Sequence, residues 1–273
     1  MNERVAIICE NDRVWGLRTW ERALPLFREE GIAVRGFWLC PKKLANLKSH
    51  EVNGWYLRTF GIHTFIKLGA YAAAAETIRL LGACLRRRSM SFRGLCRHHK
   101  LGFGVCVGPN DSTFIEWLEK NQIDILVIMV GHILKDRLLT TPRLGIINKH
   151  AALLPAHKGL FPYFWARLSG DLQGISFHTV VREIDAGNLL VQEQVEDRIS
   201  TSSMIRFYGY VFERYPGMLV SAIRNLSSGN FTFSRRSLPS SYHGLPSRED
   251  VRAFEKQGGV VITWRDVWSS LMP

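Results

Sequence analysis

Residues 146–192 read IINKHAALLPAHKGLFPYFWARLSGDLQGISFHTVVREIDAGNLLVQ. An apolar strand opens this stretch and ends in a polar turn that carries Asn148 and His150. A loop rich in Pro and Gly follows, and a second apolar strand at 174–181 leads into a turn with Asp185. Strand ends and the loops after them are where rigid elements present functional groups. The amide, the imidazole and the carboxylate are therefore our candidate catalytic groups.

The order and spacing of these residues resemble the formyltransferases that use 10-formyltetrahydrofolate. That family has Asn-x-His at a strand end, Leu-Leu-Pro, a basic residue with Gly, a Pro, an aromatic-Ala pair, Gly with an acidic residue, and Asp-x-Gly. The resemblance is strongest over about residues 100–200 and fainter at 1–60 and in the last seventy or so. The matching positions are Asn148, His150, Leu153-Leu154-Pro155, Lys158-Gly159, Pro162, Trp165-Ala166, Gly170-Asp171 and Asp185-Ala186-Gly187.

Two positions depart from the family pattern. The family usually has Pro-Ser after the His, where this chain has Ala151-Ala152, and an Arg before the loop Gly, where it has Lys158. We expect these changes to affect loop stiffness and acceptor contacts more than the three polar residues.

The resemblance implies a role for each candidate residue. Asn148 would stabilise the oxyanion, His150 would take up or share a proton, and Asp185 would orient the imidazole. The formyl donor, 10-formyltetrahydrofolate, would lie against a strand-end segment and the loop before Asp185, at Gly131, His132, Ile133, Leu134, Arg182, Glu183 and Ile184. The amine acceptor would contact Asn11, Lys158 and Tyr163.

This chemistry needs few groups. An amine attacks the formyl carbon, so the site needs a hydrogen-bond donor for the oxyanion and a base for the ammonium. An imidazole with a reference pKa near 6.5 suits a base at neutral pH. Neither a cysteine or serine nucleophile nor a metal is required, and the nine histidines form no ligand-spaced cluster such as His-Glu-x-x-His. His178, in mid-strand, is expected to be an ordinary core histidine.

The chain pattern predicts an α/β fold. Strands alternate with helices, which favours a Rossmann-like, mostly parallel sheet with helices on both faces and a small C-terminal helical appendage. We expect a catalytic domain over 1–200 and a C-terminal helix and tail over 201–273, packed on that core. The loop after the first strand is not Gly-rich, which disfavours a dinucleotide-binding dehydrogenase.

Two stretches lie between the second and the third expected strand. Residues 41–61 are expected to be irregular, with two short helical pieces. Residues 62–88 predict one long helix with a broad apolar face that includes Leu81 and Leu85, and a basic end. Packing on a sheet and docking on a membrane surface both fit such a helix.

Charge is the strongest compositional signal. The net charge is +12, the isoelectric point is about 9.8, and residues 77–110 contain no acidic side chain. Such a stretch attracts a phosphorylated substrate, nucleic acid or an anionic membrane, or is simply a solvated basic face. Five scattered cysteines without a Cys-x-x-Cys pair, and no signal peptide, predict a cytoplasmic protein.

The acceptor stays open among the branches of the family. A nucleotide-linked amino sugar fits best, because the last seventy residues are too few for the β-barrel of methionyl-tRNA formyltransferases, which makes nucleic acid an improbable partner. Other amines, such as an amino acid, a secondary metabolite or a tRNA-linked one, are alternatives. So is a non-catalytic protein that binds membrane or nucleic acid on the same fold. Peripheral membrane contact and oligomerisation are left open.

Overall fold

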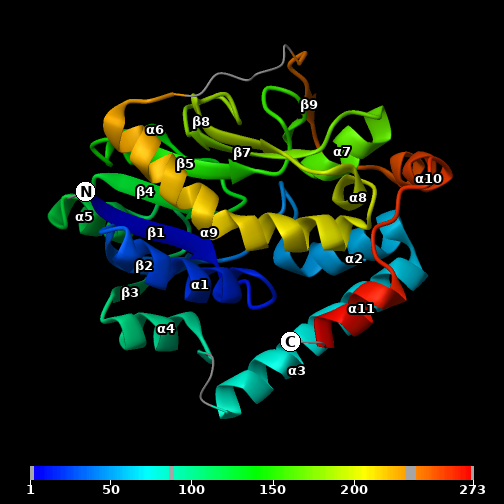
Figure 1. The fold of residues 1–273 in the computed structure, drawn as a ribbon, viewed down its shortest axis with the longest axis horizontal. Helices are drawn as coiled ribbons and strands as arrows, with labels where there is room; N and C mark the ends of the chain where they lie inside the picture. Colours follow the sequence, from blue (N-terminus) through cyan, green and yellow to red (C-terminus); the bar gives the residue numbers. More distant parts are fainter. Residues whose placement is uncertain (1–2, 86–88, 232–237, 272–273) are drawn as a thin grey trace.

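The computed structural model describes residues 3–85, 89–231 and 238–271. At its centre is a seven-stranded sheet with the order β3-β2-β1-β4-β5-β7-β8 (Figure 1). The first five strands in this order are parallel, whereas β5–β7 and β7–β8 are antiparallel. The strands are β1 (Arg4–Glu10), β2 (Ala33–Cys40), β3 (Gly102–Val105), β4 (Ile125–Met129), β5 (Gly145–His150), β7 (Gly174–Thr179) and β8 (Leu189–Gln194). The predicted α/β fold with a mostly parallel sheet is confirmed.

β4 is apolar along its whole length and β1 along its five inner residues, because helices cover both faces of the sheet. Val5, Ile7 and Cys9 of β1 pack on one face in the same core as α1 (Gly16–Glu29) and α9 (Met204–Ser228). Ala6 and Ile8 pack on the other face with α5 (Ser112–Lys120) and α6 (Asp136–Thr140). Functional groups that reach the carboxyl ends of these strands therefore stand on a rigid frame.

The C-terminal part joins the same core. Helix α9 is capped by the Ser203 side chain, which accepts a hydrogen bond from the Arg206 amide, and it ends at Gly229 in a left-handed conformation. After α9, a short strand β9 (Tyr242–His243) pairs in parallel with β6 (Lys158–Gly159). The helices α7 (Pro162–Ser169) and α10 (Arg248–Lys256) meet through stacked Phe164 and Phe254 rings. The segment after 230 thus returns to the loop that follows β5.

Of the two helical pieces expected in residues 41–61, the one at 54–60 lies within a full helix, whereas the one at 42–48 does not form. Helix α2 (Ser49–Phe60) begins where the Glu51 carboxylate accepts a hydrogen bond from the Lys48 amide, and it ends at Gly61. Its aromatic residues pack around Phe161. Tertiary packing of rings from a distant loop, absent from any local pattern, stabilises this helix. Short helices also form at α4 (Phe92–His99), α8 (Asp197–Ser200) and α11 (Trp264–Leu271).

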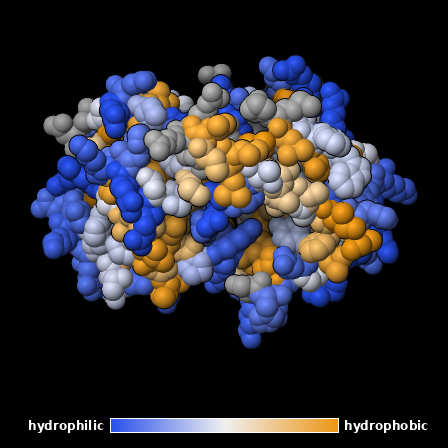
Figure 2. All heavy atoms as spheres, turned by 90° about the horizontal axis from the view of Figure 1, so that it is seen from below, coloured by the Kyte–Doolittle hydropathy of each residue, from blue (hydrophilic) through white to orange (hydrophobic). Residues whose placement is uncertain are grey.

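Helix α3 (Ile62–Cys84) forms within the predicted range 62–88, and part of its apolar face stays uncovered. Leu81 and Leu85 are exposed, because α3 packs on α11 instead of lying flat on the sheet (Figure 1). The view from the side of these two helices shows apolar patches between hydrophilic ones (Figure 2). The basic end at 86–88 lies outside the described residues. Among the helices that are described, none is both long and apolar enough to cross a membrane.

Candidate active site

The candidate site is built on the last residues of β5. Asn148 and His150 are two residues apart on this strand, so their side chains leave the sheet on the same face. Across the antiparallel pair, Asn148 lies opposite His178 and His150 lies opposite Ser176 of β7. Strand pairing therefore places four polar side chains on one face, beside the loop that carries Asp185.

The loop after β7 brings Asp185 to His150. The distance from His150 Nδ1 to Asp185 Oδ2 is 3.4 Å, and both side chains are almost fully buried, at 5% and 9% exposure. The amide of Gly159 donates a second contact to Asp185 Oδ2 at 2.8 Å. A Cβ at Gly187 would lie 1.7 Å from the Thr179 carbonyl oxygen, so the turn after Asp185 needs a glycine to pass this close to β7.

His178 also belongs to this cluster, which the sequence analysis missed. Its Nε2 lies 3.4 Å from Asp185 Oδ1, and its Nδ1 lies 2.8 Å from the Thr179 carbonyl oxygen. The ring is buried but contacts a carboxylate, so it is not an ordinary core histidine. The sequence held a signal for this role. His178 lies at the end of the strand that leads into the turn with Asp185, and the neighbouring strand carries Asn148.

Hydrogen bonding fixes where protons sit on the two imidazoles. A carbonyl oxygen only accepts, so Nε2 of His150, 2.7 Å from the His157 oxygen, must carry a proton. The same argument puts a proton on Nδ1 of His178. In their neutral forms both rings therefore face Asp185 with a bare nitrogen. One additional proton, on either ring or on the carboxylate, would turn such a contact into a hydrogen bond.

The environment lowers the pKa of both groups, which favours a neutral His150 and an ionised Asp185. Burial lowers the pKa of His150 to about 4, although the Asp185 charge and the His157 carbonyl act to raise it. Burial alone would raise the pKa of Asp185, but contacts with His178, the His150 charge and the Gly159 amide together lower it to about 2. We conclude that Asp185 is ionised, and that the buried cluster of His150, His178 and Asp185 can take up one proton.

Lys149 points to the opposite face of the sheet. Its Nζ lies 5.1 Å from the centre of the Phe212 ring and 5.9 Å from that of Tyr208. Burial lowers the pKa of Lys149 to about 8, opposed by the charges of Asp12 and Asp185. The strand thus separates a polar face with Asn148 and His150 from an aromatic-lined cation on the other side.

The segment predicted to hold the formyl donor lies at the end of β4. Glu10 accepts a hydrogen bond from the Gly131 amide at 3.1 Å, and a Cβ at Gly131 would lie 2.3 Å from the Lys43 carbonyl oxygen. Asn110, which the sequence analysis did not select, donates to the Ile133 carbonyl at 2.9 Å and accepts from the Lys135 amide at 2.7 Å. These contacts fix the backbone around Gly131–Leu134.

Two side chains of this segment differ in exposure. Ile133 is exposed, whereas Leu134 is buried in the core. Burial, with a smaller effect of the Lys43 charge, lowers the pKa of His132. Within the described part of the chain, the buried Nδ1 of His132 has no hydrogen-bond partner. An unpaired buried nitrogen of this kind is a candidate contact for a bound ligand.

The second predicted donor-binding segment lies close to the first. Arg182 forms an ion pair with Asp136 at 2.6 Å, which ties the loop before Asp185 to the start of α6, just after Leu134. Glu183 and Ile184 are exposed in this loop. The structure thus brings 131–134 and 182–184 to the same edge of the sheet as His150.

The three residues predicted to contact the acceptor differ in their exposure to solvent. Asn11 is exposed in the loop after β1, and Lys158 lies in β6, directly before the Gly159 amide that binds Asp185. Tyr163, in contrast, is fully buried, its hydroxyl donates to the Ser202 carbonyl at 2.6 Å, and its ring packs on Phe207. The expectation that Tyr163 contacts an acceptor is corrected: it is a core residue.

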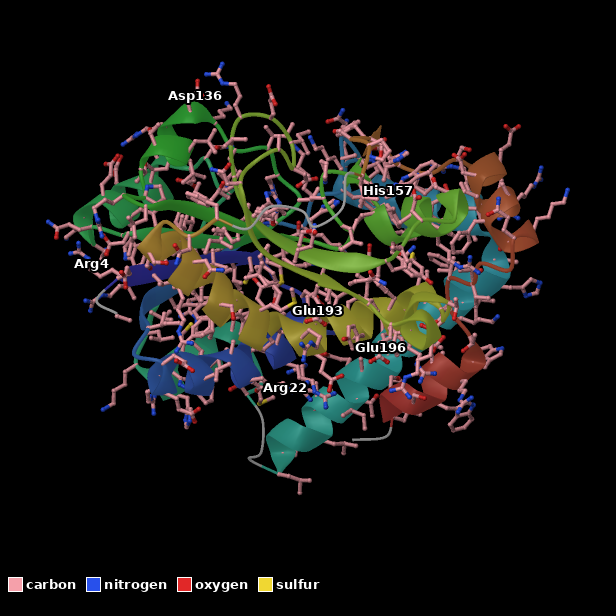
Figure 3. All side chains as sticks on the ribbon, turned by 45° about the horizontal axis from the view of Figure 1, so that its top comes forward. Arg4, Arg22, Asp136, His157, Glu193 and Glu196 are labelled. Atoms are coloured by element: carbon pink, nitrogen blue, oxygen red, sulfur yellow. The ribbon has the colours of Figure 1, made fainter. Side chains whose placement is uncertain are left out.

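A second histidine pair supports the loop after β5. His157, labelled in Figure 3, lies 2.8 Å from Asp171 through Nε2 and 3.3 Å from His243 Nε2 through Nδ1. The His243 ring stacks on Trp165 and on His157. Since the His157 carbonyl also accepts the hydrogen bond from His150, these contacts orient the catalytic candidate indirectly.

Comparison with known proteins places this site in a known context. Residues 107–206 match the family model described as formyl transferase, and this segment contains Asn148, His150 and Asp185. A methionyl-tRNA formyltransferase of Fusobacterium nucleatum is 39% identical over 88 residues, which are 32% of this chain and 28% of that protein. The chain therefore matches less than a third of the length of this curated relative.

Solved structures share the fold at low identity. A sugar N-formyltransferase of a Shewanella species aligns with a TM-score of 0.56 and 14% identity, over 90% of this chain and 78% of that one. An N-formyltransferase of Helicobacter canadensis, solved with folinic acid and dTDP-3-aminofucose, aligns with a TM-score of 0.50 and 17% identity, over 91% and 72%. The likeness extends over most of the chain, well beyond the segment that matches the family model.

Proposed function

We propose that this chain, whose residues 107–206 match the formyl transferase family model, transfers a formyl group from 10-formyltetrahydrofolate to a primary amine. The observation that carries the proposal is the buried contact between His150 and Asp185, on the strand face that also carries Asn148. This is the constellation that amine acylation needs, an amide donor beside a proton acceptor.

The steps balance without a metal or a covalent enzyme intermediate. The amine nitrogen bonds to the formyl carbon, and the carbonyl becomes an oxyanion that the Asn148 amide stabilises. The His150–Asp185 pair accepts the proton that the amine loses, at the bare Nδ1 facing the carboxylate. The bond from the formyl carbon to the folate nitrogen then breaks, and the same proton passes to that nitrogen. His178, against the other oxygen of Asp185, keeps the carboxylate in place.

The finer proposal is that the acceptor is a nucleotide-linked amino sugar. The Helicobacter structure supports it, because that protein was solved with a formylated folate and an amino-sugar nucleotide. The excess of positive charge in this chain also suits an acceptor with phosphate groups. An amino acid, a secondary metabolite or an aminoacyl-tRNA would carry the same reacting amine and belongs in the same test.

Two measurements test the proposal. Folinic acid should bind in calorimetry with a dissociation constant below millimolar, since it is a stable formylated folate. 10-Formyltetrahydrofolate should then be consumed, as followed by absorbance, with one of a panel of amino-sugar nucleotides, amino acids and aminoacyl-tRNA. A His63→Gln variant, changed in the exposed first turn of α3, serves as the matched control. If folinic acid does not bind and no amine is formylated, the proposed function is wrong.

A further inference from the structure

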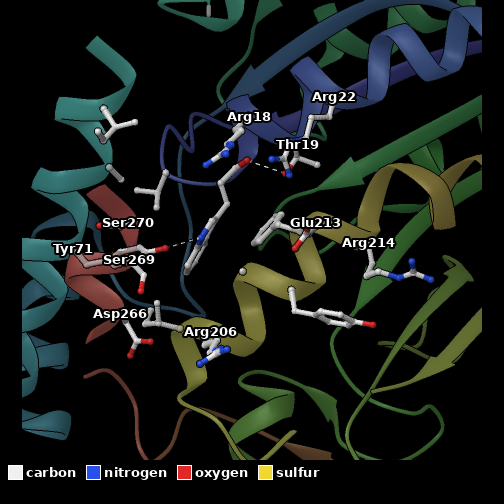
Figure 4. A pocket seen from close by; sticks show the side chains of 18 of the residues that line it. Arg18, Thr19, Arg22, Tyr71, Arg206, Glu213, Arg214, Asp266, Ser269 and Ser270 are labelled. Carbon is white, nitrogen blue, oxygen red and sulfur yellow. Dashed lines mark hydrogen bonds between the residues drawn. The ribbon is translucent and has the colours of Figure 1, made fainter. Parts of the chain in front are cut away.

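A large cavity lies on the other side of the molecule's central sheet from Asn148 and His150. Its volume is about 900 Å³, and α1, α3, α9 and α11 surround it (Figure 4). None of Asn148, His150 and Asp185 lines it. Its walls come from two helices in the first third of the chain, α1 and α3, and two in the last third, α9 and α11, so folding assembles it from separate pieces.

The lining is dominated by arginines. Eight arginines line the cavity against four acidic residues, Glu21, Glu196, Glu213 and Asp266. The guanidinium groups come from every side, as Figure 4 shows for Arg18 and Arg22 on α1 and for Arg206 and Arg214 on α9. The full set is Arg13, Arg18, Arg22, Arg79, Arg198, Arg206, Arg214 and Arg265.

Ion pairs neutralise only some of this charge. Arg13 and Arg79 both pair with Glu76. Arg214 pairs with Glu193 at 2.7 Å, and Arg198 lies 3.8 Å from Glu196. Among the residues that the structure describes, Arg22, Arg206 and Arg265 have no carboxylate within ion-pair distance. Like charges that face each other across a cavity repel and oppose folding. Such an arrangement is stabilised when an anion binds between them.

One wall of the cavity is aromatic. Trp15 and Phe212 stack with ring centres 5.3 Å apart, and the Trp15 indole donates to the Tyr71 hydroxyl at 3.1 Å. Both rings line the cavity, and on its far side Phe212 covers the buried Lys149 ammonium. This wall adds apolar surface to an otherwise cationic space, and it separates the cavity from the strand that carries His150.

We propose that this cavity is a binding site for a diphosphate group, either of a nucleoside diphosphate or of free pyrophosphate. Guanidinium groups bind phosphate oxygens through paired, charge-assisted hydrogen bonds, and several of them from opposite walls match the spread charge of a diphosphate. A volume of about 900 Å³ is at the upper end of small-molecule sites and admits a whole nucleotide. The aromatic wall gives a nucleoside ring an apolar surface. The inference does not depend on formyl transfer, because it uses none of the groups near His150.

Calorimetry with three probes tests it: UDP, pyrophosphate and uridine. UDP should bind with one site per chain, more weakly as salt is raised, and uridine should not bind. Pyrophosphate that binds as tightly as UDP would identify the phosphates as the recognised part, whereas tighter binding of UDP would show that the aromatic wall contributes. Either result supports the diphosphate site.

Variants locate the binding. The double variant Arg22→Gln/Arg206→Gln should weaken UDP or pyrophosphate at least tenfold, and its melting temperature should no longer rise with the ligand. Both side chains are exposed, so the fold is expected to survive. The control Arg252→Gln removes one exposed charge from α10, outside the cavity, and should bind like the wild type. Binding by neither anion at millimolar concentration, or undiminished binding by the double variant, would overturn the inference.

Discussion

Asp185 is the residue on which the candidate site converges. Three elements reach it: β5 through His150, β7 through His178 and the loop after β5 through the Gly159 amide. Because carbonyl oxygens hold the far nitrogens of both imidazoles, each ring meets the carboxylate with a nitrogen that is bare when neutral. The cluster of His150, His178 and Asp185 can therefore take up one proton, which the attacking amine would supply in the proposed reaction.

His178→Gln tests whether the second imidazole positions Asp185. His178 is one of the groups that lower the pKa of His150, so without it we expect turnover to decrease about tenfold or more and the acidic limb of the pH–rate profile to shift to higher pH. A purely structural effect would lower the amount of folded protein without moving that limb. The profile is measured beside the control His63→Gln, and an unchanged profile would mean that His178 only fills space.

The lowered pKa of His150 makes folding sensitive to acid. Its folded value, about 4, is below the reference value of about 6.5, so the unfolded chain binds more protons between these two pH values. The free energy of unfolding should therefore decrease as pH falls from about 6.5 to 4, by at most about 1.4 kcal/mol per pH unit for one group. Urea unfolding at several pH values measures the slope. His150→Gln should remove most of this slope; an equally steep slope in that variant would assign it to other groups.

At the scale of elements, close approach of backbones holds the Asp185 turn against β7. Gly187→Ala would place a methyl group 1.7 Å from the Thr179 carbonyl oxygen, so either the turn or the strand must move. We expect a loss of about 3 kcal/mol in the free energy of unfolding, with reduced turnover because Asp185 shifts.

The matched control is Gly209→Ala in α9. A Cβ there meets nothing within 4 Å, so alanine should stabilise the helix by about 0.5–1 kcal/mol. Chemical denaturation of both variants gives the comparison. If Gly187→Ala unfolded like the wild type, the described packing of this turn would be incorrect.

Elements with a strong local signal could be predicted, and those that depend on distant partners could not. The apolar runs of β1 and β4 and the serine cap and terminal glycine of α9 are signals of the local kind, because their causes lie within the element or next to it. Only the second half of helix α2 was expected to be helical, since its aromatic residues pack on Phe161, a hundred residues later. For the same reason the sequence could not reveal that His178 faces Asp185 or that Tyr163 is buried: both depend on which strand and helix lie next to them.

At the scale of the molecule, the C-terminal segment supports the site from outside. The β6–β9 pair joins residues 158–159 to 242–243, next to the Gly159 amide that binds Asp185. His243→Ala removes stacking on Trp165 and His157, so we expect a loss of about 1–2 kcal/mol in stability and a smaller loss of turnover than at His150. The neighbouring Tyr242→Ala, at a largely exposed side chain, is the control and should change stability by less than about 0.5 kcal/mol. Equal effects at both positions would argue against this support.

Turnover of 10-formyltetrahydrofolate with the acceptor found in the amine screen shows whether Asn148, His150 and Asp185 act together in formyl transfer. Asn148→Ala, His150→Ala and Asp185→Ala should each lose on the order of a hundredfold or more. The triple variant should lose much less than the product of the three single losses, because the groups act as a unit. A folded His150→Ala protein with turnover close to that of the wild type would contradict the account.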